Sequence, residues 1–154
     1  MSDLTIQKDQ LSVIVHFSDG SKLKGYIFLS AFRDEHGGHQ QVADLLESGK
    51  QFIPLMVEGG NVEFLNYSQI LMVEGELITK DDDDMLYAAL LHQEEVSVII
   101  ADTYIINGTL LSEARPDHSR LSDCLNIEEK FLKMRTEDRY LHVNKALVKK
   151  VVSR

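Results

Sequence analysis

The stretch VIVHFSDGSKLKGYIF, residues 13–28, decides the fold because a related stretch, VSVIIADTYIINGTLL, returns at residues 96–111. At a constant spacing of 83 positions, four residues of the first stretch fall on identical residues of the second: Val13 on Val96, Val15 on Val98, Asp19 on Asp102 and Gly25 on Gly108. Self-similarity at a fixed spacing is the sequence signature of an internal repeat. The match therefore predicts that one structural unit occurs twice.

Two further pairs of segments match in the same order along the chain. VADLLESGKQFIPL from Val42 aligns with LSDCLNIEEKFLKM from Leu121 at a spacing of 79, and NYSQILMV from Asn66 aligns with NKALVKKV from Asn144. Three matches in one order favour a tandem duplication over a chance likeness of two amphipathic patterns. The predicted parts of the chain are a first repeat over 11–76, an acidic linker over 77–95 and a second repeat over 96–154.

Each repeat is predicted to run β-β-α-β-β. Apolar residues alternate along the first strand, and Asp19-Gly20 supplies the turn before the second strand at 23–29. Residues 41–47 have helical spacing, and Gly49 is placed to end that helix in a left-handed conformation. Two more strands follow, and Pro54 in the first of these favours an edge position or a bulge. The expected fold class is α+β, mostly β, with two bent sheets or small barrels related by pseudo-two-fold symmetry.

The predicted linker is LITKDDDDMLYAALLHQEE, residues 77–95. The acidic run 81–84 suits the first turn of a helix, because carboxylates accept hydrogen bonds from unpaired backbone N–H groups and favour the positive end of the helix dipole. A calcium site is the alternative, but a calcium loop interleaves its acidic residues and places a glutamate twelve positions from the start. The sequence therefore favours a short amphipathic helix with a solvated cap.

The stretch VIVHFSDGSKLKGYIF is similar to the first signature of Sm-like proteins, in which an alternating strand, Asp-Gly and a glycine-containing second strand open a small bent barrel. The segments that begin at Asn66 and Asn144 look like degenerate second signatures of that family. The helix falls after the second strand here, and no RNA-contacting loop of the family matches, so none of its binding residues carries over. The chain also resembles a duplicated bacterial domain of unknown function, which implies no activity.

The charge is unevenly distributed although the chain as a whole is acidic, with a net charge of −9. Residues 1–76 carry five basic and eleven acidic residues, whereas residues 96–154 carry ten basic and eight acidic ones. A basic second repeat suits an acidic protein surface or a phosphate-bearing ligand, although an ordinary solvated surface explains it as well. The candidate binding residues are Arg115, Arg120, Lys130, Lys133, Arg135 and Arg139. A pI near 5.0 disfavours nucleic acid as the partner.

Residues typical of metal or catalytic sites are sparse in this sequence. The pair His36 and His39, with His118 in the corresponding loop, is the one spacing that suggests a metal, and a surface loop explains it better. Cys124 occupies an apolar helical position and is expected to be a buried thiol. His16 is expected to face solvent. The sequence contains no nucleophile elbow and no phosphate-binding glycine loop, so we expect no cofactor, no metal and no enzyme activity.

The helix start RLSDCLN, residues 120–126, has the counterpart QVADLLE, residues 41–47, in the first repeat. Three positions are common to both repeats. They are Asp44 and Asp123, Leu46 and Leu125, and Phe52 and Phe131. These shared positions suit a helix start and a core, so both phenylalanines are expected to pack inward. Arg120, Ser122 and Asn126 occur in one repeat alone and remain candidates for a separate function.

Two classes of function fit these patterns. The first is a non-catalytic protein interaction or scaffold module that offers strand edges or the linker helix to a protein partner or to a second copy. The second is an Sm-like protein that binds a small ligand or RNA through the basic second repeat. A single cysteine indicates a reducing compartment, so a cytoplasmic location is expected. No apolar run approaches the roughly 20 residues that a membrane span needs, so no membrane partner is expected.

Overall fold

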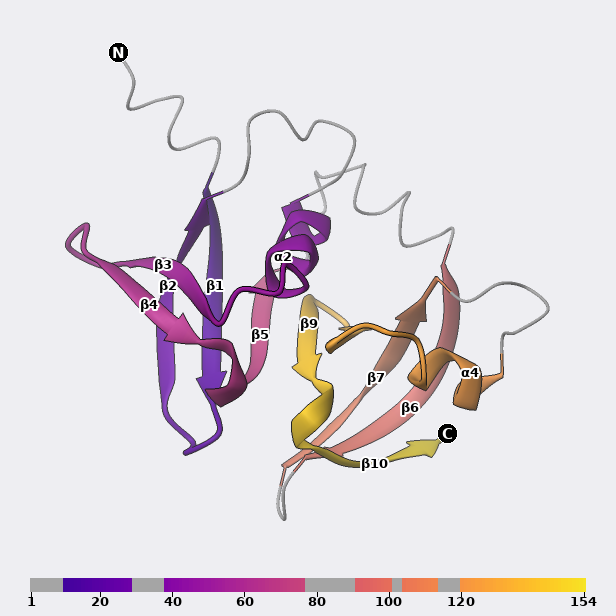
Figure 1. The fold of residues 1–154 in the computed structure, drawn as a ribbon. Coiled ribbons are helices and arrows are strands. Elements are labelled where there is room, and N and C mark those ends of the chain that lie inside the picture. The colour runs from indigo at the N-terminus through magenta and orange to yellow at the C-terminus, as the bar shows by residue number, and fades with distance from the viewer. Residues whose placement is uncertain (1–9, 29–37, 77–90, 101–103, 114–119) are drawn as a thin grey trace.

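The chain is mostly β, as expected from its alternating patterns. The computed structural model describes residues 10–28, 38–76, 91–100, 104–113 and 120–154. Its ten described strands form one antiparallel ladder, accompanied by two short helices (Figure 1). The strands curve in space instead of lying in one plane. No helix in the described ranges is long and apolar enough to cross a membrane.

The first half of the chain supplies five strands, a helix and a 3-10 turn. In chain order these are β1 (Gln10–Phe17), β2 (Lys22–Phe28), α2 (Gly38–Leu46), β3 (Phe52–Val57), β4 (Val62–Asn66), η1 (Tyr67–Gln69) and β5 (Ile70–Glu76). The fifth strand was not among the four expected in each repeat. It follows the 3-10 turn directly, so the segment from Asn66 combines a turn and a strand.

The second half supplies the same kinds of element in the same order. They are β6 (His92–Ile100), β7 (Tyr104–Ser112), α4 (Leu121–Leu125), β8 (Phe131–Arg135), β9 (Arg139–Asn144), η3 (Lys145–Leu147) and β10 (Val148–Ser153). Strand β6 begins inside the range expected for the linker. The expected linker helix after the acidic run lies outside the described residues.

The two halves are joined within one ladder. The strand order is β10-β6-β7-β8-β9-β5-β1-β2-β3-β4, so within each half the fifth strand lies beside the first and the fourth lies at the far side. The halves meet where β9 pairs with β5. We call this pairing the junction. Strands β4 and β10 end the described ladder, which is open, and we call them the free edges.

A close crossing at one glycine shapes each half. A β-carbon on Gly25 would lie 2.6 Å from the backbone oxygen of Met56, and one on Gly108 would lie 2.8 Å from the backbone oxygen of Arg135. These glycines therefore let the second strand of each half approach the third more closely than a side chain allows. They are the same pair that the sequence alignment matched.

The turns follow the predicted chemistry in the first half. Gly20, Gly59 and Gly60 have positive φ angles, and the Asp19 carboxylate accepts hydrogen bonds from the backbone and hydroxyl of Ser21. These bonds hold the pKa of Asp19 below its usual value. Gly49 follows α2 with a φ of 83°, the left-handed conformation expected at a helix end. Glycine favours each of these positions because it has no β-carbon to clash.

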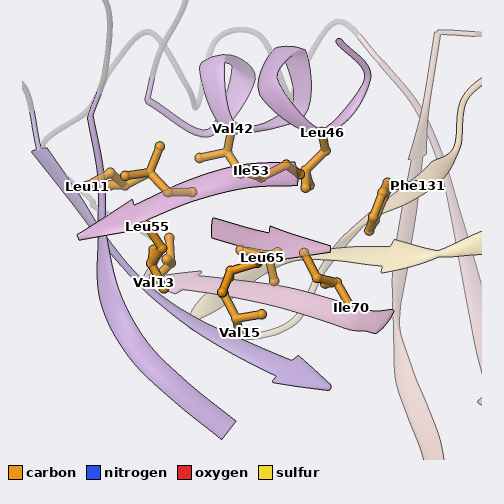
Figure 2. Close-up of a cluster of buried hydrophobic side chains, with 12 residues drawn as sticks. Leu11, Val13, Val15, Val42, Leu46, Ile53, Leu55, Leu65, Ile70 and Phe131 are labelled. Carbon is orange, nitrogen blue, oxygen red and sulfur yellow. The ribbon is translucent and has the colours of Figure 1, made fainter. Parts of the chain in front are cut away.

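Two apolar cores fill the two halves, and each core receives residues from the other half. The first core gathers side chains from β1, β3, β5 and α2, together with Phe131 of β8 (Figure 2). The second gathers side chains from β6 to β9 and Cys124 of α4, together with Leu71 and Met72 of β5. The exchange of residues across the junction means that the two halves share their cores.

Candidate interaction surface

The junction is an antiparallel strand pairing with a defined register. Met72 pairs with Val143, Val73 with His142, Glu74 with Leu141 and Gly75 with Tyr140. Tyr140 and His142 of β9 are buried by this arrangement. The junction is thus a strand-to-strand contact between two parts of the chain that are far apart in sequence.

Glu74 is the centre of a polar cluster at the junction. One carboxylate oxygen lies 2.8 Å from Nε2 of His16, and the other lies 2.7 Å from Nη1 of Arg139. His16 is therefore buried and paired, and the expectation that it faces solvent was wrong. Strand alternation alone placed it on the polar side of β1, but β5 brings a carboxylate to that side. The cluster links β1, β5 and β9 and fixes their relative position.

The end of α2 also contacts the second half. The carboxylate of Glu47 accepts hydrogen bonds from the backbone N–H groups of Lys130 and Phe131, at 2.8 Å and 2.9 Å respectively. A carboxylate that receives two backbone donors forms charge-assisted hydrogen bonds, which are stronger than neutral ones. Glu47 therefore anchors the start of β8 and directs the Phe131 ring into the first core.

Asn144 adds a third contact across the junction. Its Nδ2 atom donates to the backbone oxygen of Ile70 at 2.9 Å, while its Oδ1 atom accepts from the backbone of Ala146 at 3.1 Å. The side chain thus caps the 3-10 turn of its own half and binds the fifth strand of the other. Asn66 makes the equivalent cap, because its Oδ1 atom accepts from Ser68.

Two ionisable side chains near the start of β8 have perturbed pKa values. Burial raises the pKa of Glu129, and the nearby Lys133 and Lys145 only partly oppose this effect. Burial lowers the pKa of Lys145, whose Nζ atom donates to the backbone oxygen of Ile127 at 2.6 Å. Both shifts have a structural cause, the packing of these side chains between α4, β8 and the following turn.

Three of the seven exposed large apolar side chains in the described ranges lie on the free edges, and a fourth lies on β3 beside one of them. Phe64 and Val62 of β4 are 67% and 46% exposed, Phe52 of β3 is 53% exposed, and Val152 of β10 is 43% exposed. The expectation that Phe52 packs inward was therefore wrong, although its counterpart Phe131 is buried. The physical reason is position in the ladder. Phe131 lies beside the junction, and Phe52 lies beside a free edge.

Some of the candidate basic residues are engaged by other groups of the fold. Arg139 pairs with Glu74, and the Nζ atom of Lys130 lies 4.7 Å from the centre of the Tyr67 ring. Arg120 is exposed at the start of α4 and makes no side-chain cap there. Arg115 lies outside the described residues. Several of these charges therefore have partners within the fold.

Lys133 and Arg135 lie two positions apart on β8 and share one side of that strand. Nη2 of Arg135 donates to the Gln93 side chain at 3.3 Å, and Arg135 lines an open depression with Glu95 and Glu137. Acidic side chains beside the arginine reduce its attraction for an anion.

The remaining predicted features are only partly described. Cys124 is buried in α4, as expected for a structural thiol. The side chains of His36, His39 and His118 lie outside the described residues. Among the residues that the structure does describe, no three His, Cys, Asp or Glu side chains are grouped so as to hold a metal ion.

Sequence reasoning did not identify Glu47, Glu74 or Phe64 as functional residues. Glu47 had a signal, because it ends a predicted helix and aligns with Asn126, one of the residues noted as specific to one repeat. Phe64 had a weaker signal, since it is a large aromatic residue that follows Glu63 near the end of a predicted strand. Glu74 had none, because its partners come from strands distant in sequence.

Comparison with known proteins gives no assignment. No family model, curated protein or solved structure matches the chain.

Proposed function

We propose that this protein is a non-catalytic, cytoplasmic interaction module that binds protein segments by adding a strand to its sheet. The observation that carries the proposal is the pair of free edges bordered by exposed apolar side chains, above all Phe64 on β4. An unpaired edge presents a row of backbone donors and acceptors, and an extended segment satisfies them. Side chains beside the edge then supply selectivity.

The junction supports this proposal because it is itself a strand addition between two parts of the same chain. There, β9 adds to the edge of β5, Glu47 holds the start of the preceding strand β8 by its backbone, and Phe131 fills the neighbouring core. These are the components that strand addition uses, namely a backbone ladder with a side-chain anchor.

We also propose that the chain is a tandem duplication of a bent, Sm-like unit. Support comes from the equal strand order of the halves and from the equivalent close crossings at Gly25 and Gly108. A further correspondence is the irregular register between the first and fifth strands of each half, at Phe17 in one and at Val148 in the other. A free edge would then be an inherent feature of each end of the duplicated ladder.

Selection from a peptide library displayed on phage tests strand addition, with the full chain as bait. We expect enriched peptides with alternating apolar residues, bound by the native protein and lost with Phe64→Glu. The matched control is Ile105→Glu, which alters a residue of similar exposure on β7, a strand that is neither of the two free edges. Failure to enrich any peptide, or equal loss with both variants, would contradict the proposal.

The alternative function is binding of RNA or a small phosphate-bearing ligand through the basic second half. It is favoured by Lys133 and Arg135 on one side of β8. This function predicts salt-sensitive retention on a polyphosphate or RNA column at about 50 mM salt, because phosphate contacts release counterions. Elution in the void fraction at that salt, with peptide binding intact, would leave strand addition as the function.

A further inference from the structure

The junction and the two free edges are related by the correspondence of the two halves. Strand β9 occupies the fourth place in its half, as β4 does, and β5 occupies the fifth place, as β10 does. The junction therefore pairs a fourth strand with a fifth strand. The free edges are the remaining fourth strand and the remaining fifth strand.

We infer that the partner of β4 is β10 of a second copy of this chain, in a head-to-tail contact that repeats the junction. This inference rests on the proposed function and names its partner. A contact that uses two different surfaces leaves one of each surface open in every pair. Further copies therefore add until a ring closes or a filament grows.

The junction fixes the register that such a contact would have. Asn66 aligns with Asn144, and Val73 aligns with Val151, so the observed pairs can be transferred strand by strand. The transferred pairs are Leu65 with Lys150, Phe64 with Val151, Glu63 with Val152 and Val62 with Ser153, the first residue of each pair coming from one copy and the second from the next.

Residues that are exposed near the β4 edge correspond to residues that are buried near the junction. The positions of Phe64 and Val62 correspond to His142 and Tyr140, and that of Phe52 corresponds to Phe131. All three residues near the junction are buried, whereas all three near the free edge are exposed. The same positions thus differ in exposure because a neighbouring half covers one set. A second copy would cover the other set.

The helix ends also correspond. Glu47 accepts the backbone N–H groups of Lys130 and Phe131, and its aligned position in the second half is Asn126. The Asn126 side chain also has an acceptor oxygen, which in the repeated contact would face the backbone N–H of Phe52 from the next copy. This gives Asn126, a residue specific to one repeat, a role that its helix alone does not require.

Charge favours β10 over a second β4 as the occupant of the β4 edge. Strand β4 carries Glu63, and β10 carries Lys149 and Lys150. In the transferred register Lys150 and Glu63 are diagonal neighbours on one face, within reach of long side chains. A contact between two β4 edges would instead bring two acidic strands together, and one between two β10 edges would bring lysines together.

Molecular mass measured by sedimentation velocity over a range of protein concentrations tests the inference on the full chain. We expect the native protein to exceed its monomer mass of 17.5 kDa, and Phe64→Glu and Val152→Glu each to sediment as monomers. Ile105→Glu is the matched control and should assemble like the native protein.

Mixing the two edge variants identifies the pairing. Phe64→Glu retains an intact β10, and Val152→Glu retains an intact β4, so an equal mixture should form a dimer and stop there. A native protein that stays monomeric at all concentrations would overturn the inference, as would a mixture without dimers while either variant dimerises alone. In both cases the peptide selection remains a separate test of the proposed function, because a monomer that binds peptides would still act by strand addition.

Discussion

Asn144 and Asn66 show how one residue type acquires two roles from its place in the sheet. Each caps a 3-10 turn through its Oδ1 atom, and Asn144 also donates to the backbone oxygen of Ile70 across the junction. A buried amide that satisfies a carbonyl of another strand has no access to water as a substitute partner. Its loss therefore costs more than the loss of a cap alone.

Replacement of these two asparagines separates the cap from the junction contact. Asn144→Ala should lower the free energy of unfolding by about 2 to 3 kcal/mol, since it removes a cap and leaves a buried carbonyl without its donor. Asn66→Ala should cost only about 0.5 to 1 kcal/mol, the value of a cap. Urea unfolding at a dilution that keeps the protein monomeric measures both. Equal losses would show that the bond to Ile70 contributes little.

At the scale of elements, the bend of each half depends on the approach of its second strand to its third. Only Val57 and Met56 of β3 pair with β2, at Gly25 and Tyr26, and Pro54 lies beyond this short contact. The expectation of an edge or bulge position for Pro54 is consistent with that, because a residue without an N–H cannot extend the ladder to β2. A short crossing at a glycine lets the strand leave its neighbour and curve around the core.

Addition of one methyl group at either crossing should strain the bend. Gly25→Ala and Gly108→Ala should each lower the free energy of unfolding by about 1 to 3 kcal/mol, because the new methyl group meets a backbone oxygen that cannot rotate away. Ser12→Ala, at an exposed position of β1, is the control and should change stability by less than about 0.5 kcal/mol. Thermal and urea unfolding measure these changes. Glycine variants as stable as Ser12→Ala would contradict the role of the close crossings.

At the scale of the whole molecule, the halves are not independent folding units in this structure. Phe131 belongs to the second half by sequence and to the first core by contact, and Leu71 and Met72 make the reverse exchange. The ion pair of Glu74 with Arg139 and the hydrogen bonds of Glu47 to the backbone before β8 also connect the two halves. Stability of each half therefore depends on the presence of the other.

The two aligned phenylalanines provide a direct test of this dependence. Phe131→Ala should lower the free energy of unfolding by about 3 to 5 kcal/mol, since it leaves a cavity in the first core. Phe52→Ala, the matched change at the free edge, should cost less than about 0.5 kcal/mol in the monomer. A cost for Phe52→Ala that appears only at high concentration would add to the evidence for assembly. Similar costs for both variants in the dilute monomer would contradict the shared core.

Much of the local structure could be predicted from the sequence. Alternation marked the strands, Gly20 and Gly49 marked a turn and a helix end, and the burial of Cys124 followed from helical spacing. These features depend on backbone preferences and on periodicity over a few residues, which a single sequence displays directly. The fifth strand was not predicted, because only a three-residue 3-10 turn separates it from β4.

The surface could not be predicted in the same way. His16 is buried because Glu74 reaches it from 58 positions away, and Glu47 meets the backbone of Lys130 from 83 positions away. Arg139, one of the predicted binding residues, pairs with Glu74 of the other half. Pairing over such separations depends on which strand edges meet, and local pattern does not encode that choice.

The sequence by itself determined that the chain is mostly β, where its first turns lie and that Gly25 corresponds to Gly108. Only the tertiary structure decided that the halves share one ladder, and that Phe131 is buried while the aligned Phe52 is exposed. The physical reason is that propensity and alternation act within each strand, whereas burial depends on what covers the strand. At the junction the other half provides that cover, whereas in the described part of the chain no strand pairs with the outer side of either free edge.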